Sequence, residues 1–169
     1  SVEGVSTLDT LEVNSMQIRD LSGLEAAKNL KVLVLRDNLI EDLTPILDLP
    51  HLIKLDLSGN RLRRVEPLVM LSGHKMRSQV ADLQLSLENR RQTKDEKAAA
   101  IREMSEIIER LQKGPWALKE LNLSNNFLLG LSGIENMRDL QHLDVSGNSL
   151  IDLEGIGKLK SLYTLYACL

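Results

Sequence analysis

Leucines return at fixed intervals along most of this chain, with polar residues between them. The first leucine of one interval lies 22 residues before the first leucine of the next, apart from one longer gap. These first positions are Leu8, Leu30, Leu52, Leu118, Leu140 and Leu162. A fixed period of this length indicates a stacked array of similar coils that share one hydrophobic core.

Within a coil the pattern is L-x-x-L-x-L-x-x-N-x-L, as from Leu30 to Ile40, where isoleucine takes the last place. The L-x-L centre predicts a short strand, because successive side chains of a strand point to opposite faces. Stacked strands then form a parallel sheet, with the leucines inside and the intervening residues outside. The asparagine, Asn38 in this coil, lies where the chain leaves the strand. Its amide can bond the backbone of adjacent turns, and losing it should cost about 1 to 3 kcal/mol.

The segments that return from one strand to the next favour turns or short 3₁₀ helices over long helices. The residues responsible are Pro45, Pro67, Gly23, Gly133 and Gly155. This repeat resembles that of the leucine-rich repeat family, and its length resembles the SDS22-like and internalin-like class. The resemblance covers residues 1–73 and 115–169. It implies one α/β solenoid domain over 1–169, with a parallel sheet on a concave face and thin turns on a convex face.

The repeat lapses between Leu71 and Leu118, and we assign residues 74–114 to a helical insertion within the solenoid. The second half of the insertion predicts a helix, since Thr93 and Glu96 have the spacing of a capping box. An apolar stripe follows at helical spacing, formed by Ala98, Ile101, Met104, Ile108 and Leu111.

The first half of the insertion fits two structures. Met76, Val80, Leu83 and Leu87 fall on one helical face, which predicts a helical hairpin that turns near residues 89–93. Val80-x-x-Leu83-x-Leu85 also copies the repeat strand, so residues 75–92 could instead continue the sheet. We favour the hairpin. Its apolar stripe would pack on the sister helix or the solenoid, or else serve as a docking arm for another protein.

The composition of the chain disfavours several classes of function. The chain has 43% hydrophobic residues, enough for a sizeable core, and only 2% aromatics, which disfavours base stacking on nucleic acid. A formal net charge of −3 gives no basic field for DNA, and no apolar run has membrane-spanning length. With Cys168 as the one cysteine, and no histidine cluster, phosphate loop or nucleophile motif, we expect no enzyme, no metal and no cofactor.

The alternation of the strands predicts which side chains line the concave face. Val32 and Val34 stand out as apolar side chains that would face water, and Tyr166 with Tyr163 adds amphipathic area. The candidate partner-binding residues are Glu12, Val32, Val34, Arg36, Lys54, Asp56, Glu120, Asn122, His142, Asp144 and Tyr166.

These observations favour a protein–protein interaction module, an adaptor, scaffold or regulatory subunit that holds a protein partner on a preformed concave face. The alternative is a structural spacer of a larger surface or multidomain protein, with the helical insertion as its docking element. We expect part of a longer chain or complex, because both ends start or stop within a repeat and lack a polar cap. SDS22-like resemblance implies a cytoplasmic protein, whereas internalin-like resemblance implies a secreted or cell-surface one.

Overall fold

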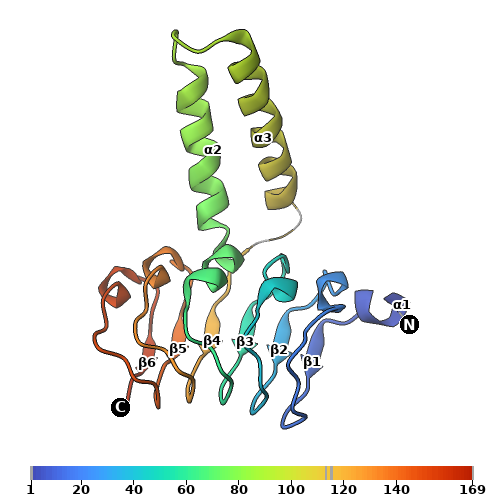
Figure 1. Cartoon of the computed structure of the whole chain (residues 1–169), viewed down its shortest axis with the longest axis vertical. Helices are drawn as coiled ribbons and strands as arrows, with labels where there is room; N and C mark the ends of the chain where they lie inside the picture. The colour runs from blue at the N-terminus through green and yellow to red at the C-terminus, as the bar shows by residue number, and fades with distance from the viewer. Residues whose placement is uncertain (1, 113, 115, 169) are drawn as a thin grey trace.

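The computed structural model describes residues 2–112, 114 and 116–168, excluding the side chains of residues 2, 3 and 74. Its six short strands form one parallel sheet in the order β1 to β6 (Figure 1). The strands are β1 Thr10–Glu12, β2 Val32–Val34, β3 Lys54–Asp56, β4 Glu120–Asn122, β5 His142–Asp144 and β6 Thr164–Tyr166. Each coil therefore adds one strand beside the strand of the preceding coil, as the repeat predicts.

The register of the sheet places the central leucines in one column. Leu33 pairs with Leu55, Leu55 with Leu121, and Leu121 with Leu143. These four side chains are at most 2% exposed and belong to a single core that runs the length of the solenoid. The hydrophobic period thus fixes both the fold and the pairing of strands that lie 66 residues apart in sequence across β3 and β4.

The convex side consists of short 3₁₀ helices, as the glycines and prolines predict. They are η1 Leu24–Ala26, η2 Thr44–Ile46, η3 Glu66–Ser72, η4 Ile134–Asn136 and η5 Ile156–Lys158. Gly133, which precedes η4, has a φ of 90°, and a Cβ there would lie 3.1 Å from Val69 Cγ2. A short helix, α1 Val2–Ser6, takes the equivalent place before β1 and contacts η1.

The asparagine that recurs at one place in the pattern has a clear structural role. Asn126 accepts a hydrogen bond from the Leu62 N–H (2.9 Å) and donates to the carbonyls of Leu57 (2.9 Å) and Leu123 (3.0 Å). It therefore bonds its own coil and the preceding one in the interior of the stack. Equivalent bonds are made by Asn38, Asn60 and Asn148.

Two helices, α2 His74–Leu87 and α3 Lys94–Gln112, stand between β3 and β4 and pack against each other as a hairpin. The hairpin rises from the edge that carries the 3₁₀ helices, opposite the loops that follow the strands (Figure 1). The alternative strand over residues 80–85 is wrong, because these residues lie in α2. The capping box is confirmed: Thr93 N–H donates to Glu96 Oε2 (2.7 Å) and Glu96 N–H to Thr93 Oγ1 (3.2 Å).

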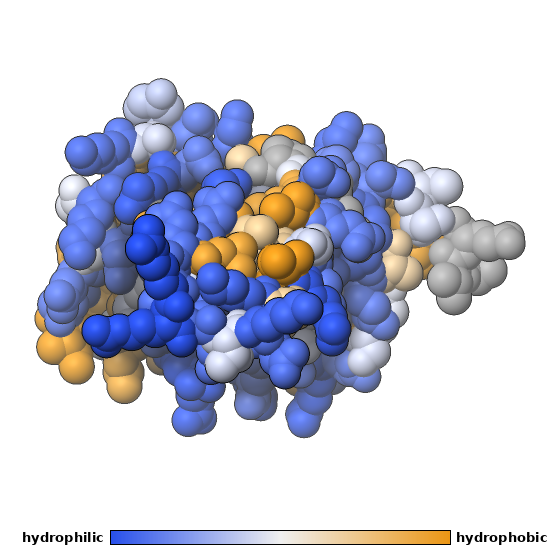
Figure 2. Space-filling view, turned by 90° about the horizontal axis from the view of Figure 1, so that it is seen from above, coloured by the Kyte–Doolittle hydropathy of each residue, from blue (hydrophilic) through white to orange (hydrophobic). Residues whose placement is uncertain are grey.

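The predicted apolar stripe of α3 matches the packed face only in part. Met104 and Leu111 of the stripe are half-buried, and Leu111 packs in the second core described below. Ile101 and Ile108 of the stripe are exposed, whereas Ala100 and Ile107, which lie outside it, are buried. Both sets recur at helical spacing, and the position of α2 decides which of them is covered. Seen from above the hairpin, a small hydrophobic area is surrounded by hydrophilic side chains (Figure 2).

The base of the hairpin is fastened to the solenoid by a second, smaller core. Trp116, Met76 and Ile107 are buried together, with Val80, Leu83 and Leu111 packed around them. Trp116 Nε1 donates to the Arg110 carbonyl (3.0 Å), and its backbone N–H donates to the Pro50 carbonyl (3.0 Å). The foot of the hairpin is thus attached to the second coil at Pro50, and α2 also contacts η3 of the third coil.

Candidate functional site

The outward residues of the strands form the columns that the sequence predicts. One column is Thr10, Val32, Lys54, Glu120, His142 and Thr164, and the next is Glu12, Val34, Asp56, Asn122, Asp144 and Tyr166. Strand pairing alone sets these columns, since each residue lies directly beside its counterpart in the neighbouring coil. The concave face is therefore a grid whose chemistry changes from coil to coil.

A shallow hollow of about 200 Å³ lies over β3 to β6 on this face. Eight of the eleven candidate residues line it: Arg36, Lys54, Asp56, Glu120, Asn122, His142, Asp144 and Tyr166. Glu12, Val32 and Val34 lie toward β1 and β2 and do not line it. Leu55, Leu121 and Leu143 also line the hollow, although their side chains belong to the core and are at most 2% exposed.

The expectation that Val34 exposes an apolar side chain to water is wrong. Its side chain is only 6% exposed, so it does not present an apolar surface to water, while Val32 is half-buried. Val34 lies between Glu12 and Asp56 in the register, and the neighbouring Arg36 reaches across to Asp56. The alternation within one coil predicts which way Val34 points but not how much of its side chain the neighbouring coils cover.

Asp56 is a structural residue of the face rather than a free acidic group. It is 3% exposed, receives Arg36 Nε at 2.7 Å, and accepts bonds from the N–H (3.0 Å) and hydroxyl (2.7 Å) of Ser58. The hydrogen bond to Asp56, and then its charge, raises the pKa of Arg36. A substitution at Asp56 would therefore leave Arg36 without its partner and disturb the fold as well as the surface.

Lys54 and Glu120 form a second ion pair, across the β3–β4 boundary, at 2.9 Å. Both side chains are more than two-fifths exposed, so the pair contributes little to stability. Such a pair can open and offer either charge to a ligand at small cost. The boundary where the hairpin departs is thus also the place where the concave face carries adjacent opposite charges.

The C-terminal part of the hollow holds the side chains that are best placed to meet a partner. Asp144 accepts a hydrogen bond from the Ser146 N–H (2.9 Å), and within the described part of the chain it has no ion-pair partner. Tyr166, beside it in the register, is well exposed. His142 Nδ1 lies 3.1 Å from Thr164 Oγ1, and its ring centroid lies 6.4 Å from that of Tyr163. An unpaired carboxylate next to exposed rings suits a cationic or aromatic side chain.

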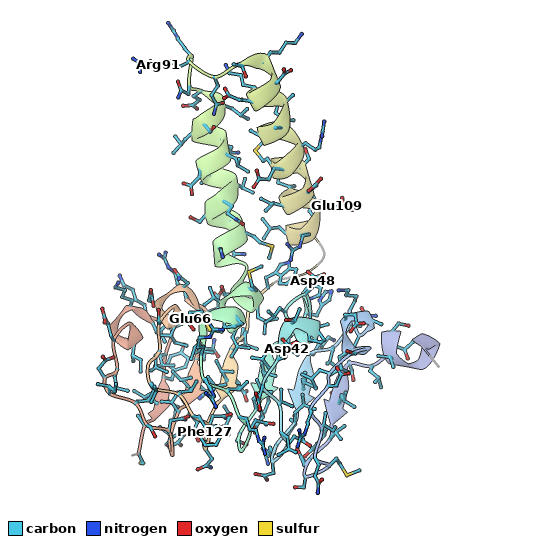
Figure 3. The ribbon with its side chains drawn as sticks, viewed as in Figure 1. Asp42, Asp48, Glu66, Arg91, Glu109 and Phe127 are labelled. Carbon is cyan, nitrogen blue, oxygen red and sulfur yellow. The ribbon has the colours of Figure 1, made fainter. Side chains whose placement is uncertain are left out.

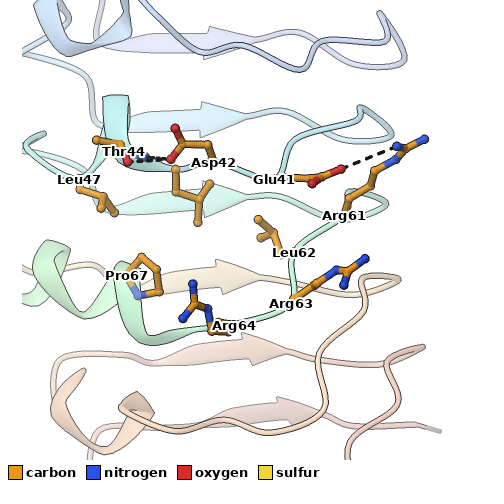
Figure 4. A pocket seen from close by; sticks show the side chains of 10 residues that line it. Glu41, Asp42, Thr44, Leu47, Arg61, Leu62, Arg63, Arg64 and Pro67 are labelled. Carbon is orange, nitrogen blue, oxygen red and sulfur yellow. Dashed lines mark hydrogen bonds and ion pairs between the residues drawn. The ribbon is translucent and has the colours of Figure 1, made fainter.

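A second groove, of about 340 Å³, lies on the return side between the second and third coils (Figure 4). Its charged side chains largely serve the fold: Arg61 lies 3.7 Å from Glu41, and Asp42 accepts bonds from the Thr44 N–H (2.9 Å) and hydroxyl (2.6 Å). The Thr44 hydroxyl and then its N–H lower the pKa of Asp42. We therefore do not assign a ligand to this groove.

Sequence reasoning did not find the contact that ties α3 to the solenoid. Asp48 receives Arg110 Nη2 and Lys28 Nζ, each at 3.0 Å, and lies below the foot of α3 (Figure 3). Burial raises the pKa of Asp48, but hydrogen bonds from Lys28 and Arg110 outweigh it and hold that pKa below its ordinary value. No local signal marks this contact, because Arg110 is 62 residues from Asp48.

Within residues 2–112, 114 and 116–168, no cluster of three or more His, Cys, Asp or Glu side chains could hold a metal ion. The side chain of His74 lies outside the described part. Among the described helices, none has the combination of length and apolar character that a bilayer crossing needs. Cys168 is exposed and unpaired.

The parallel sheet, the shared leucine core and the grid of outward side chains define a solenoid of stacked repeats, a class that generally mediates protein–protein interaction. The family model for "Leucine Rich repeats (2 copies)" matches residues 28–70 and 116–158, which together make up half of the chain. The chain belongs to the leucine-rich repeat family.

Several solved structures share this fold. An internalin C2 from Listeria monocytogenes has a TM-score of 0.57 at 22% identity, over 99% of this chain and 64% of that one. The ectodomain of the receptor kinase SOBIR1 from Arabidopsis thaliana has a TM-score of 0.53 at 20% identity, over 94% and 68%. A repeat protein from Leptospira interrogans has a TM-score of 0.52 at 21% identity, over 94% and 37%. The chain thus spans less than two thirds of the internalin, and no curated protein matches it.

Proposed function

We propose that this chain is a non-enzymatic interaction module that binds a protein partner on its concave face, at the hollow over β3 to β6. The observation that carries the proposal is the gathering of eight candidate residues around one hollow, with half-buried Asp144 and exposed Tyr166 at its C-terminal end. A preformed sheet loses little conformational entropy on binding, which favours recognition of an extended or convex segment.

The closest description of its role is an adaptor or regulatory subunit of the SDS22-like type. The 22-residue coils and the 3₁₀ returns support this subclass. We place the protein in the cytoplasm, where an exposed cysteine such as Cys168 stays reduced. The structural likeness to an internalin and to a receptor ectodomain supports the other placement, a secreted or cell-surface protein.

The test is site-specific photocrosslinking in extracts of the source organism. Tyr166 is replaced by p-benzoylphenylalanine, which preserves an exposed aromatic ring at the hollow, and Lys158 on the convex side is replaced in the control variant. We expect a discrete crosslinked partner from position 166 and none from position 158. Crosslinking of the same protein from both positions with equal yield contradicts binding at the concave face.

A charge reversal gives the matched affinity test. Asp144→Lys should weaken binding of the crosslinked partner by about tenfold. Asp144→Asn retains an oxygen that can accept the hydrogen bond from the Ser146 N–H, so its affinity for the partner should fall by less. The circular dichroism melt of both variants should stay close to that of the wild type. Asp144 has no ion-pair partner within the described residues, and Asp144→Lys loses only the hydrogen bond from the Ser146 N–H. Asp56 is unsuitable for this test because it is buried beneath Arg36.

The spacer alternative has one observation in its favour. The hairpin is anchored at its foot and carries exposed apolar side chains, Leu85 on α2 and Ile101 on α3. If Leu85→Ser with Ile101→Ser abolishes assembly while crosslinking from position 166 is unchanged, the hairpin is the docking element and the chain acts as a spacer.

A further inference from the structure

A strip of exposed apolar side chains lies on the loop edge of the solenoid, where the chain turns back after β4 and β5. Its members are Phe127, Leu129 and Ile151, which are 58%, 59% and 82% exposed. Figure 3 shows Phe127 on this edge, opposite the hairpin. The Ile151 N–H donates to the Leu129 carbonyl at 3.1 Å, so the two segments lie side by side. We call these three residues the loop-edge strip.

The repeat does not require apolar residues at these positions. Leu129 and Ile151 stand where the earlier coils carry Arg19, Glu41 and Arg63. The residues that the repeat does require here, Leu128 and Leu150, point inward and are buried. Neighbouring exposed apolar side chains in adjacent coils therefore indicate a contact with another molecule.

The charges beside the strip differ at its two ends. Arg63 and Arg64 lie in the coil before it, and Asp152 and Glu154 follow it in the coil of Ile151; all four are exposed. Within the described residues none of the four has an ion-pair partner. Along the solenoid the surface thus runs from positive through apolar to negative within three coils.

The centre of the strip is open. Gly130 occupies the position that Arg64 and Asp152 occupy in the coils on either side. Its backbone is not left-handed, and a Cβ on it would meet no atom within 4 Å, so neither conformation nor packing requires glycine. Its lack of a side chain lets a facing surface approach the backbone between the two charged ends.

We propose that the loop-edge strip is an interface between two copies of this chain. A two-fold axis lying in the interface plane along the fourth coil brings Leu129 against its counterpart and places Arg64 of one copy opposite Asp152 of the other, twice. The surface is thus complementary to itself in both charge and hydrophobicity. An anionic membrane fits less well, because Asp152, Glu154 and the nearby Glu41 would meet it together with the arginines.

Charge-reversal variants test this arrangement, with the dimer dissociation constant measured by sedimentation equilibrium. Arg63→Glu with Arg64→Glu makes both ends of the strip acidic, and Asp152→Lys with Glu154→Lys makes both ends basic. Each double variant alone should have a dimer dissociation constant raised about tenfold or more, whereas an equal mixture should form a heterodimer. The quadruple variant, with the charges exchanged, should again form a homodimer.

Two further variants separate the interface from general effects on the fold. Leu129→Asp should give a monomer with an unchanged circular dichroism melt, since Leu129 is exposed. Arg19→Glu, at the equivalent position of the first coil, should dimerise like the wild type. Asp144→Lys should also dimerise normally. A loss of partner binding at the concave face can therefore be told apart from a loss of dimerisation at the loop-edge strip.

Three outcomes overturn the proposal: a wild type that stays monomeric up to its solubility limit, a dimer that Leu129→Asp leaves intact, or double variants that do not associate when mixed. Cosedimentation of a monomeric wild type with phosphatidylserine vesicles, lost in Leu129→Asp, would assign the strip to a membrane surface instead.

Discussion

The coils and the hairpin both bury apolar stripes, but they do so with very different completeness. In the coils, successive leucines such as Leu33, Leu55 and Leu121 are almost fully buried in one continuous core. In the hairpin, the buried core around Trp116 lies near the foot, Ala100 is buried higher on α3, and Leu85 and Ile101 remain exposed. An inner coil is covered by a neighbour on each side, whereas α2 and α3 pack chiefly on each other, with η3 beside the start of α2.

This difference indicates where the stability of the molecule resides. Repeat proteins gain stability from the interfaces between neighbouring units, so damage to an inner coil affects the units on both sides. The hairpin depends instead on its junction with the second coil, where Trp116 bonds Pro50 and Arg110 pairs with Asp48. We therefore expect the solenoid to tolerate changes in the hairpin much better than changes in its leucine column.

The largest effect should come from a leucine of the central column. Leu121→Ala removes a side chain that is 2% exposed in the middle of the sheet and should lower the free energy of unfolding by about 3 kcal/mol. Leu83→Ala, at a half-buried position of α2, should cost about 1 kcal/mol. Urea unfolding followed by circular dichroism measures both.

Leu85→Ala serves as the control for these two variants. The Leu85 side chain is exposed, so its removal should change the free energy of unfolding by less than about 0.5 kcal/mol. Equal losses for Leu121→Ala and Leu83→Ala would mean that the hairpin is as strongly coupled to the core as the coils are.

An intermediate effect is expected from the asparagine that joins the third and fourth coils. Asn126→Leu removes the acceptor for the Leu62 N–H and the donor for the Leu57 carbonyl, which should cost about 1 to 3 kcal/mol. Hydrogen exchange should locate the damage by faster exchange of the Leu62 amide.

The matched control is an asparagine of the hairpin turn. Asn89 accepts one exposed hydrogen bond from the Arg91 N–H at 3.0 Å, and Asn89→Ala should cost no more than about 0.5 kcal/mol. If both asparagine substitutions cost the same, the bonds between coils are not what holds the stack together.

The same contrast explains how much could be predicted from sequence. The register of the sheet, from Leu33 to Leu143, follows from the repeat because each coil must match the next in period. The outward columns follow with it, which is why eight candidate residues gather at one hollow. The burial of Val34 and Asp56 was missed, since it depends on the neighbouring coils; Asp56, for example, is bonded by Arg36 of the preceding coil.

The sequence predicted the hairpin helices but not which face of α3 is buried. The sequence of α3 offers apolar residues on two adjacent faces, Ile101 with Ile108 and Ala100 with Ile107, and periodicity alone ranks them equally. The choice depends on α2 and on Trp116, whose position relative to α3 no local pattern encodes. Distant contacts decide such cases, whereas the coils repeat the same contact in every unit.

The smallest expected effect concerns the ion pairs at the foot of the hairpin. Because the pKa of Asp48 is lower in the folded protein than its ordinary value of 3.8, its ionised form stabilises the junction above about pH 4. That stabilisation is lost as the pH falls through the folded pKa. Lys28, Arg110 and Asp48 are each more than a third exposed, so solvent screening limits the effect to less than about 1 kcal/mol.

Trp116, the one tryptophan of the chain, is buried at this junction, so its fluorescence reports on it. The urea midpoint of Trp116 emission should fall on acidification from about pH 5 to about pH 3 by more in the wild type than in Asp48→Asn. Asp42→Asn is the control, because the pKa of Asp42 is also lowered, by Thr44, but Asp42 makes no contact with the hairpin among the described residues. This variant should follow the wild type. An equal acid response in Asp48→Asn and the wild type would mean that packing around Trp116, without the ion pairs, holds the hairpin to the coils.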